Sequence, residues 1–228
     1  MTNETASPDA LRQEMRTLEA HYAKLITDNA DAPAGAQWRD RATQERRMVV
    51  LAEVADLRRA KVLDFGCGTG HMLSVLRSQL GFDGTYVGYD LVESALEIGR
   101  STYPDARFER RDVLAEGLPE QFDYILVSGV FNNALSDNWT FLTTVIEKLF
   151  AATRCALAFN LLSTYVDTFD SGLAYFDPAR VFGFCKEHLS PRVTLRHDYE
   201  VRPGVVPFEF TTYVYRTDIA CRANRAVP

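Results

Sequence analysis

The sequence predicts an α/β fold, with a mostly parallel, doubly wound sheet of seven strands and an antiparallel strand near the C-terminus. First, the apolar run Val62–Phe65 leads through a glycine-rich turn directly into helical spacing from Met72 to Leu80, which is the first unit of a nucleotide-binding sheet. Second, further strand-like and helix-like segments alternate after it. Third, segments 193–199 and 210–215 alternate around a turn, which indicates an antiparallel pair.

Two helices are expected before the sheet. Ser7 can cap the first helix and Pro8 suits its first turn. The second is expected from Trp38 to about Arg58, after the Gly/Pro/Ala-rich segment 28–37. We therefore divide the chain into a helical extension or lid at 1–58 and a sheet domain at 59–228, which form one structural unit, and we expect the extension to cover the ligand-binding edge of the sheet.

The remaining elements follow in order. Strands are expected at 85–89, 107–111, 122–127 and 155–161, with helices at 94–100, at 137–151 and after Asp177-Pro178. These alternate as a doubly wound sheet requires.

Composition narrows the class of protein. The 228 residues carry a net charge of -6, which argues against broad binding to nucleic acid or to an anionic membrane. Cys67, Cys155, Cys185 and Cys221 form no CxxC pair, so we expect reduced thiols and no metal site. Neither a cationic start with an apolar run after it nor a run of membrane-spanning length is present, so a soluble, cytoplasmic protein is expected.

The glycine loop is the first candidate site. Glycines between a strand and a helix bring backbone N–H groups and the helix dipole close to a ligand. The pattern alone also fits a dinucleotide loop or a tight turn without a ligand. Asp64 precedes the loop, and Asp90 ends the next strand, 24 positions after Gly66. An acid at that point accepts hydrogen bonds from ribose hydroxyls, so the context favours an adenosine-containing ligand.

Four segments together resemble the class I S-adenosylmethionine (SAM)-dependent methyltransferases. They are VLDFGCGTG at 62–70, VGYDLVESALEIGR at 87–100, RRDVL at 110–114 and FDYILVSGV at 122–130. The resemblance extends from about Val62 to Arg216 and implies SAM as cofactor, S-adenosylhomocysteine (SAH) as product and no metal. It also implies the cofactor-binding residues: Asp64, Gly66, Cys67, Gly68 and Gly70 around the methionine part, Asp90 at the ribose, Leu91, Asp112 and Val113 at the adenine, and Ser128 near the methyl group.

The acceptor half of the site is less well defined. Methyl transfer from a sulfonium needs alignment above all, and a base only if the acceptor holds a proton. Candidate catalytic residues are His71, Asn132 and Tyr165, and candidate substrate or lid residues are Tyr22, Trp38, Gln44, Phe131, Asn133 and Tyr175. Each has a structural alternative: helix-end solvation for His71, a turn or cap for the asparagines, and ordinary packing for the others.

We expect methyl transfer to a small polar metabolite or sugar-like intermediate, with oxygen preferred over nitrogen or carbon. The segment after Val127 lacks the Pro-Pro-aromatic sequence of members that methylate base nitrogens, and no paired-glutamate loop of protein-arginine members is visible. No nucleic-acid or membrane partner is expected. Two alternatives stay open: an RNA or protein substrate, favoured by the basic cluster of Arg107, Arg110 and Arg111, and a catalytically silent SAM-binding subunit. The acceptor and the oligomeric state are not determined.

Overall fold

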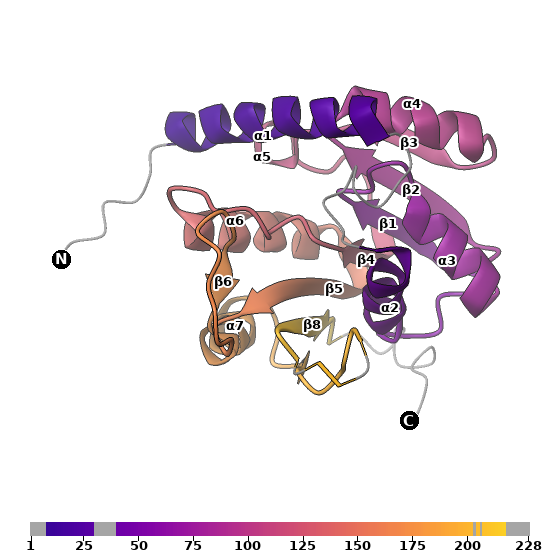
Figure 1. The fold of residues 1–228 in the computed structure, drawn as a ribbon. Coiled ribbons are helices and arrows are strands. Elements are labelled where there is room, and N and C mark those ends of the chain that lie inside the picture. Colours follow the sequence, from indigo (N-terminus) through magenta and orange to yellow (C-terminus); the bar gives the residue numbers. More distant parts are fainter. Residues whose placement is uncertain (1–7, 30–39, 203, 206, 218–228) are drawn as a thin grey trace.

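A computed structural model describes residues 8–29, 40–202, 204–205 and 207–217. Its centre is one sheet in the order β3-β2-β1-β4-β5-β8-β7 (Figure 1). The strands on this path are β1 (Lys61–Phe65), β2 (Thr85–Asp90), β3 (Arg107–Arg110), β4 (Phe122–Val127), β5 (Thr153–Ser163), β7 (Val193–Arg196) and β8 (Glu209–Tyr215). β1 to β5 are parallel, β8 is antiparallel to β5, and β7 is antiparallel to β8. The predicted class is confirmed, with a short additional strand, β6 (Tyr175–Phe176), beside β5.

Helices cover both faces of this sheet. They are α1 (Pro8–Asn29), α2 (Arg41–Ala52), α3 (His71–Leu80), α4 (Glu93–Thr102), α5 (Val113–Glu116), α6 (Asn138–Ala151) and α7 (Pro178–Phe184), which continues as the π-helical turn η2 (Cys185–Leu189). β4 shows why two cores form: Ile125 and Val127 pack with α6, whereas Tyr124 and Leu126 pack with α2 and α3. Because successive strand residues point to opposite faces, one apolar strand supplies both cores.

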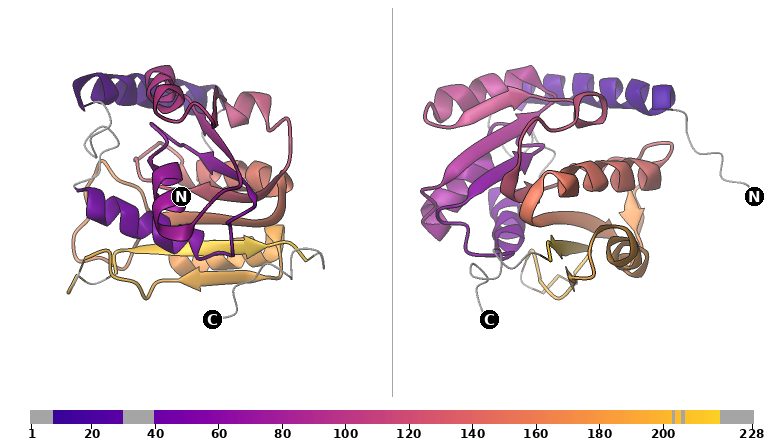
Figure 2. Two further views of the ribbon diagram at one scale, coloured as in Figure 1. Left: turned by 90° about the vertical axis from the view of Figure 1, so that its right-hand side faces the viewer. Right: turned by 180° about the vertical axis from the view of Figure 1, so that it is seen from behind.

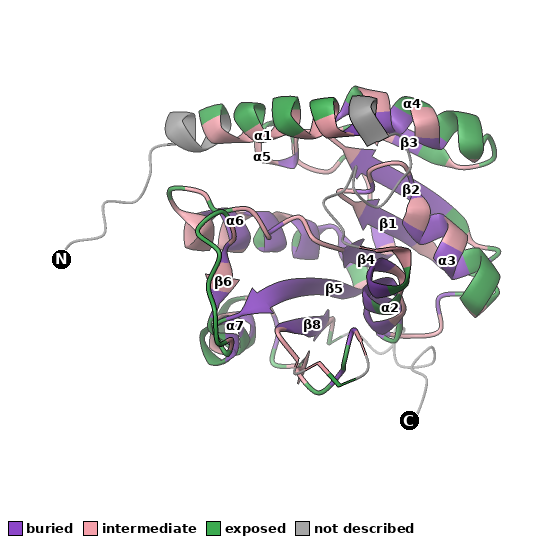
Figure 3. Cartoon of the chain, in the orientation of Figure 1, coloured by how far each residue is buried: buried purple, intermediate pink, exposed green. Residues whose placement is uncertain are grey.

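The two N-terminal helices are placed differently. α1 lies along α4 at one edge of the molecule in both views of Figure 2, and Figure 3 shows that its described residues are mostly half-buried or exposed. α2 packs on α3 and β5. It begins at Arg41, because the Asp40 carboxylate caps it by accepting a hydrogen bond from the Thr43 N–H at 2.7 Å. The expected start at Trp38 lies outside the described residues.

None of the helices within the described ranges is long and apolar enough to cross a membrane.

The structure corrects the expectation about the cysteines. Cys67 and Cys185 are buried free thiols, as expected, but Cys155 is disulfide-bonded. The expectation that all four cysteines are reduced is therefore wrong for Cys155, and Cys221 lies outside the described part of the chain.

A buried ion pair fixes α2 to β8. Arg47 donates from Nε to the Glu209 carboxylate and from Nη1 to the Thr43 carbonyl at 3.1 Å. The Tyr199 hydroxyl donates to the second Glu209 oxygen at 3.0 Å. Burial raises the pKa of Glu209, and the Arg47 charge partly opposes that rise. Since both charges are buried, neither can be removed without leaving the other uncompensated.

We predict that Glu209→Gln destabilises the fold by about 3–5 kcal/mol, because it leaves the Arg47 charge buried without a counter-charge. Urea unfolding followed by circular dichroism measures the change. The matched control is Glu53→Gln, which removes the partner of Arg196 at the surface and is expected to cost less than about 1 kcal/mol. Equal losses from the two variants would contradict a structural role for the buried pair.

Candidate active site

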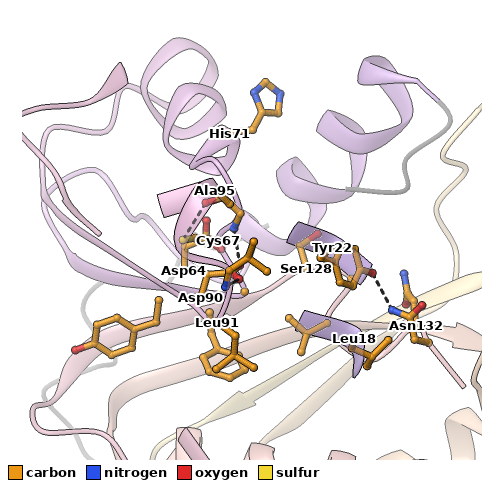
Figure 4. A pocket seen from close by; sticks show the side chains of 18 of the residues that line it. Leu18, Tyr22, Asp64, Cys67, His71, Asp90, Leu91, Ala95, Ser128 and Asn132 are labelled. Carbon is orange, nitrogen blue, oxygen red and sulfur yellow. Dashed lines mark hydrogen bonds between the residues drawn. The ribbon is translucent and has the colours of Figure 1, made fainter. Parts of the chain in front are cut away.

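A cavity of about 400 Å³ lies where β1, β2 and β4 end. The glycine loop after β1 and the segment after β4 form its floor, and both N-terminal helices cover it. Leu18, Tyr22 and Ile26 come from α1, and Gln44 and Met48 come from α2. Figure 4 shows side chains from α1, the glycine loop, the end of β2 and the segment after β4 converging on one space. Ligands of open α/β sheets bind at the carboxyl ends of the strands, so this cavity is the candidate active site.

The three glycines of the loop have different structural roles. All have positive φ angles, 75° at Gly66, 53° at Gly68 and 85° at Gly70, in the region that glycine tolerates best. A Cβ at Gly66 would lie 2.2 Å from Val130 Cγ2, and one at Gly70 would lie 2.6 Å from Phe108 Cζ. A Cβ at Gly68 would meet no atom within 4 Å. The outer two glycines therefore permit close packing, whereas Gly68 leaves open space beside the cavity.

Asp90 connects the loop to the end of β2. Its carboxylate accepts a hydrogen bond from the Gly68 N–H at 2.8 Å and one from the Val92 N–H at 2.9 Å. Burial raises the pKa of Asp90, the backbone N–H donors oppose that rise, and the charge of Glu19 on α1 adds to it. Asp90 also lines the cavity, so the same carboxylate organises the loop and faces the cavity.

Asp64 is the most buried carboxyl group of the site, with 2% of its surface exposed. The Tyr86 hydroxyl donates a hydrogen bond to it at 2.6 Å. Burial raises the pKa of Asp64 to about 7, the Tyr86 hydrogen bond lowers it, and the charge of Asp90 raises it further. Near neutral pH this carboxyl group therefore lies close to its titration midpoint, and a cationic ligand group would favour its ionised form.

Apart from Gly70, the other residues expected at the cofactor line the same cavity. Leu91, Val113 and Ser128 face it, as does Asp112, whose carboxylate also caps α5 through the Leu114 and Ala115 N–H groups. Cys67 lines it as well, and burial raises the pKa of its thiol. Ser128 Oγ is buried and has no hydrogen-bond partner among the described residues. An unpaired buried hydroxyl is costly, so it fits a ligand that supplies the missing bond.

Two lid candidates meet across the cavity. The Tyr22 hydroxyl on α1 accepts a hydrogen bond from Asn133 Nδ2 at 2.8 Å, and Figure 4 shows Tyr22 pointing toward the Asn132 end of the loop after β4. Burial raises the pKa of Tyr22, and the Asn133 bond lowers it in part. Asn132 and Gln44 also line the cavity, and Gln44 Oε1 is buried with no partner in the described part of the chain.

His71 lies at the margin of the site. It begins α3, and its Nε2 is 3.0 Å from Glu45 Oε1 on α2. It lines the cavity, but Figure 4 shows it apart from Asp90 and Ser128. The Glu45 contact joins α2 to α3, which the sequence did not indicate.

Besides Gly70, three expected site residues with aromatic side chains do not line the cavity. Tyr165 is 67% exposed and packs near His197. The Tyr175 hydroxyl accepts a hydrogen bond from the Asp170 N–H, and its ring packs on Phe169. Phe131 is in the core against Phe141 and Phe159. Trp38 lies outside the described residues. Only chain position pointed to these aromatic residues. In the structure, the three described side chains pack against other aromatic rings outside the cavity.

Part of the cavity wall is formed by residues that are not among the predicted site residues. Arg47, Arg202 and Phe208 line it, together with Leu162 and Leu173. Arg47 follows Gln44 by three positions, so helical spacing could have placed it on the same face. Arg202 and Phe208 lie in the connection to β8 and carry no local pattern. Within the described ranges, no group of three or more His, Cys, Asp or Glu side chains is placed to hold a metal ion.

The chain resembles known proteins in both sequence and fold. Residues 57–162 match the family described as "Methyltransferase domain". Trans-aconitate 2-methyltransferase of Rhizobium meliloti (strain 1021) is 32% identical over 97 residues, which cover 42% of this chain and 37% of that protein. The curated relatives are matched over only 24–39% of their own length.

Two solved structures share the fold over most of the chain. Magnesium protoporphyrin IX methyltransferase from Synechocystis PCC 6803 with bound SAM has a TM-score of 0.54 and 11% identity, covering 95% of this chain and 87% of that one. The plantazolicin methyltransferase BpumL, in complex with a desmethylPZN analog and SAH, has a TM-score of 0.60 and 14% identity, covering 91% and 99%. At these identities the likeness concerns the fold.

We predict that Gly70→Ala destabilises the protein more than Gly68→Ala does. Both substitutions place a side chain at positive φ, which costs about 1–2 kcal/mol, but only the first drives a methyl group into the buried Phe108 ring. Thermal unfolding of the two variants beside the unaltered protein measures the difference. Equal melting temperatures for the two variants would show that Phe108 moves aside freely.

We predict that Asp64→Asn removes a pH dependence of stability. The pKa of Asp64 is about 7 in the folded protein, whereas an aspartate in an unfolded chain has a pKa of about 3.9. The unfolded chain therefore binds fewer protons between those values, and the free energy of unfolding falls as pH rises through that window. Urea titrations from pH 4 to 8 should show a flatter profile for Asp64→Asn. The exposed Asp83→Asn is the control, and an unchanged slope in Asp64→Asn would refute the assignment.

Proposed function

Because this chain carries a methyltransferase domain of the class I, SAM-dependent type, we propose that it transfers a methyl group from SAM to a small polar molecule. An oxygen of that acceptor is preferred over nitrogen or carbon. The observation that carries the proposal is the covered cavity at the ends of β1, β2 and β4. In this proposal residues 1–58 act as the cover and residues 59–228 as the catalytic unit.

The residues around the glycine loop fit the cofactor. SAM, when bound, supplies an electrophilic methyl group on a positively charged sulfur. Asp64, Asp90 and Asp112 place acidic groups in this half of the cavity, which suits a cationic ligand. Asp90 would hold the ribose and Leu91 and Val113 the adenine, while Gly68 leaves room and Ser128 Oγ offers an unused hydrogen bond.

The protein's own contribution to the reaction is alignment and exclusion of water. α1 and α2 cover the cavity from two sides, and the Tyr22–Asn133 hydrogen bond holds α1 over it. A fixed nucleophile beside the cofactor needs little further catalysis. His71 and Asn132 line the cavity as candidate groups for orienting or deprotonating an acceptor, and Tyr165 is no longer a candidate because it faces solvent.

The surface charges support a small acceptor over RNA. The basic cluster that favoured RNA is engaged with carboxylates of the same chain: Arg107 with Glu120, Arg110 with Glu19, and Arg111 with Glu116. Phosphate binding needs available positive charge, so these pairs weaken that alternative. The name of the trans-aconitate relative, which refers to a small acid, is consistent with a metabolite acceptor.

Methyl transfer is tested directly with isotopically labelled SAM and a small-molecule extract of the source cells, followed by mass spectrometry. The proposal expects a labelled small molecule that depends on the folded protein. SAH binding without any labelled product would favour the silent-subunit alternative, and the absence of SAH binding would contradict both.

We predict that Asp90→Asn weakens SAH binding by about ten- to a hundredfold, since a hydrogen bond to a charged group contributes about 1.5–3 kcal/mol. Calorimetric titration with SAH measures the affinity, and a thermal melt of the free variant checks that the loop after β1 is retained. The exposed Asp83→Asn is the matched control. An unchanged dissociation constant for Asp90→Asn would remove Asp90 from the cofactor site.

A further inference from the structure

Most of the charges that line the cavity are divided between its two halves. On the glycine-loop side, Asp64 and Asp90 lie at the ends of β1 and β2, Asp112 follows β3, and Glu19 of α1 lies near Asp90. Arg111 also lines this side, where it is paired with Glu116. Arginines line the other side, at α2 and the connection to β8: Arg41, Arg47 and Arg202. An acidic half suits a cationic cofactor, so the basic half calls for a ligand group of negative charge.

α2 presents a polar face to this basic half. Arg41, Gln44 and Arg47 follow one another at three-residue spacing and all line the cavity, as neighbours on one side of a helix do. Gln44 is 5% exposed, yet its Oε1 has no hydrogen-bond partner among the described residues. A buried amide oxygen left unpaired costs free energy. Because this oxygen only accepts hydrogen bonds, it indicates a polar ligand with a donor group at this point, such as a hydroxyl.

Arg202 brings a guanidinium to α2 from the connection to β8. Its Nε donates to Thr43 Oγ1 at 3.3 Å and lies 3.9 Å from an Asp40 oxygen, beyond hydrogen-bond distance. Arg47, by contrast, is fixed in its buried pair with Glu209. Arg202 is therefore better placed than Arg47 to bind a ligand.

The apolar residues near Arg202 indicate what kind of molecule carries the negatively charged group. Met48, Leu162, Leu173 and Phe208 are apolar and line the cavity with Arg202. A carboxylate attached to a partly apolar body fits this wall, because the apolar side chains can pack against the body and an arginine binds the carboxylate through paired N–H donors.

We propose that the methyl acceptor is a small carboxylic acid whose carboxylate is bound by Arg202. This inference rests on the proposed function and narrows its substrate class. SAM also contains a carboxylate, so a carboxylate at Arg202 could come from SAM or from the acceptor. We assign Arg202 to the carboxylate of the acceptor. Arg202 then sets acceptor specificity without contributing to cofactor affinity.

The test uses the full chain, labelled SAM and the cell extract separated beforehand into anion-exchange-retained and unretained fractions. We expect labelled product only from the retained fraction. With that acceptor, Arg202→Gln should raise KM about tenfold or more, with the dissociation constant for SAH unchanged within about twofold. Arg59→Gln, an exposed arginine away from the cavity, is the matched control and should change neither quantity.

Two outcomes of this experiment overturn the inference. Label from the unretained fraction alone would show an uncharged or cationic acceptor. Equal weakening of SAH and acceptor binding in Arg202→Gln would assign the arginine to the carboxylate of the cofactor.

A binding experiment separates this inference from the proposed function, because it needs no turnover. Ligand-observed NMR compares 3-phenylpropionate with 3-phenylpropanamide, and glutarate with glutaramide, on the SAH complex. Binding of an acid over its amide, lost in Arg202→Gln and kept in Arg59→Gln, supports the subsite even if no label is transferred, in which case only the proposed function fails. No preference for either acid would contradict the subsite.

Discussion

The hydrogen bonds of the Asp90 carboxylate are the constraint on which the site depends. They tie the Gly68 N–H of the loop after β1 to the Val92 N–H at the start of α4. Neighbouring parallel strands end at the same edge of the sheet, so one side chain can join two connections that are far apart in sequence. The position of the loop, and with it the floor of the cavity, follows from this contact. Asp64 lies behind the same floor, and the proximity of the two carboxyl groups raises its pKa further.

The two N-terminal helices cover the cavity by different means. α2 is part of the core, because Arg47 pairs with Glu209 and Tyr213 donates to the Val50 carbonyl in the buried interior. α1 is held by polar contacts, from Tyr22 to Asn133, from Glu14 to Ser136 and from Glu19 to Arg110, and by an apolar cluster in which Ile26 packs with Val92 and Ala95. α1 is therefore attached at the edge of the molecule, whereas α2 is a wall of the cavity that belongs to the core.

The arrangement of charge links this architecture to chemistry. Strand ends supply the acidic half of the cavity, and α2 with the connection to β8 supplies the basic half. The first half lies within residues 57–162, which match the methyltransferase domain family. The second half is built from an N-terminal helix and a C-terminal connection, both outside that match. In the proposed function, acceptor choice therefore depends on residues outside the matched segment.

The sequence by itself determined the sheet, its order of elements and the residues at the strand ends, because burial patterns and glycine turns are local signals. Asp64, Asp90, Asp112 and Ser128 were predictable for that reason, and all four line the cavity. Only the tertiary structure decided which distant side chains complete it. Arg202 reaches the site through the antiparallel return of the chain, and Phe131 and Tyr165 turn to the core and to solvent. Such directions depend on packing between segments far apart in sequence, which no local pattern encodes.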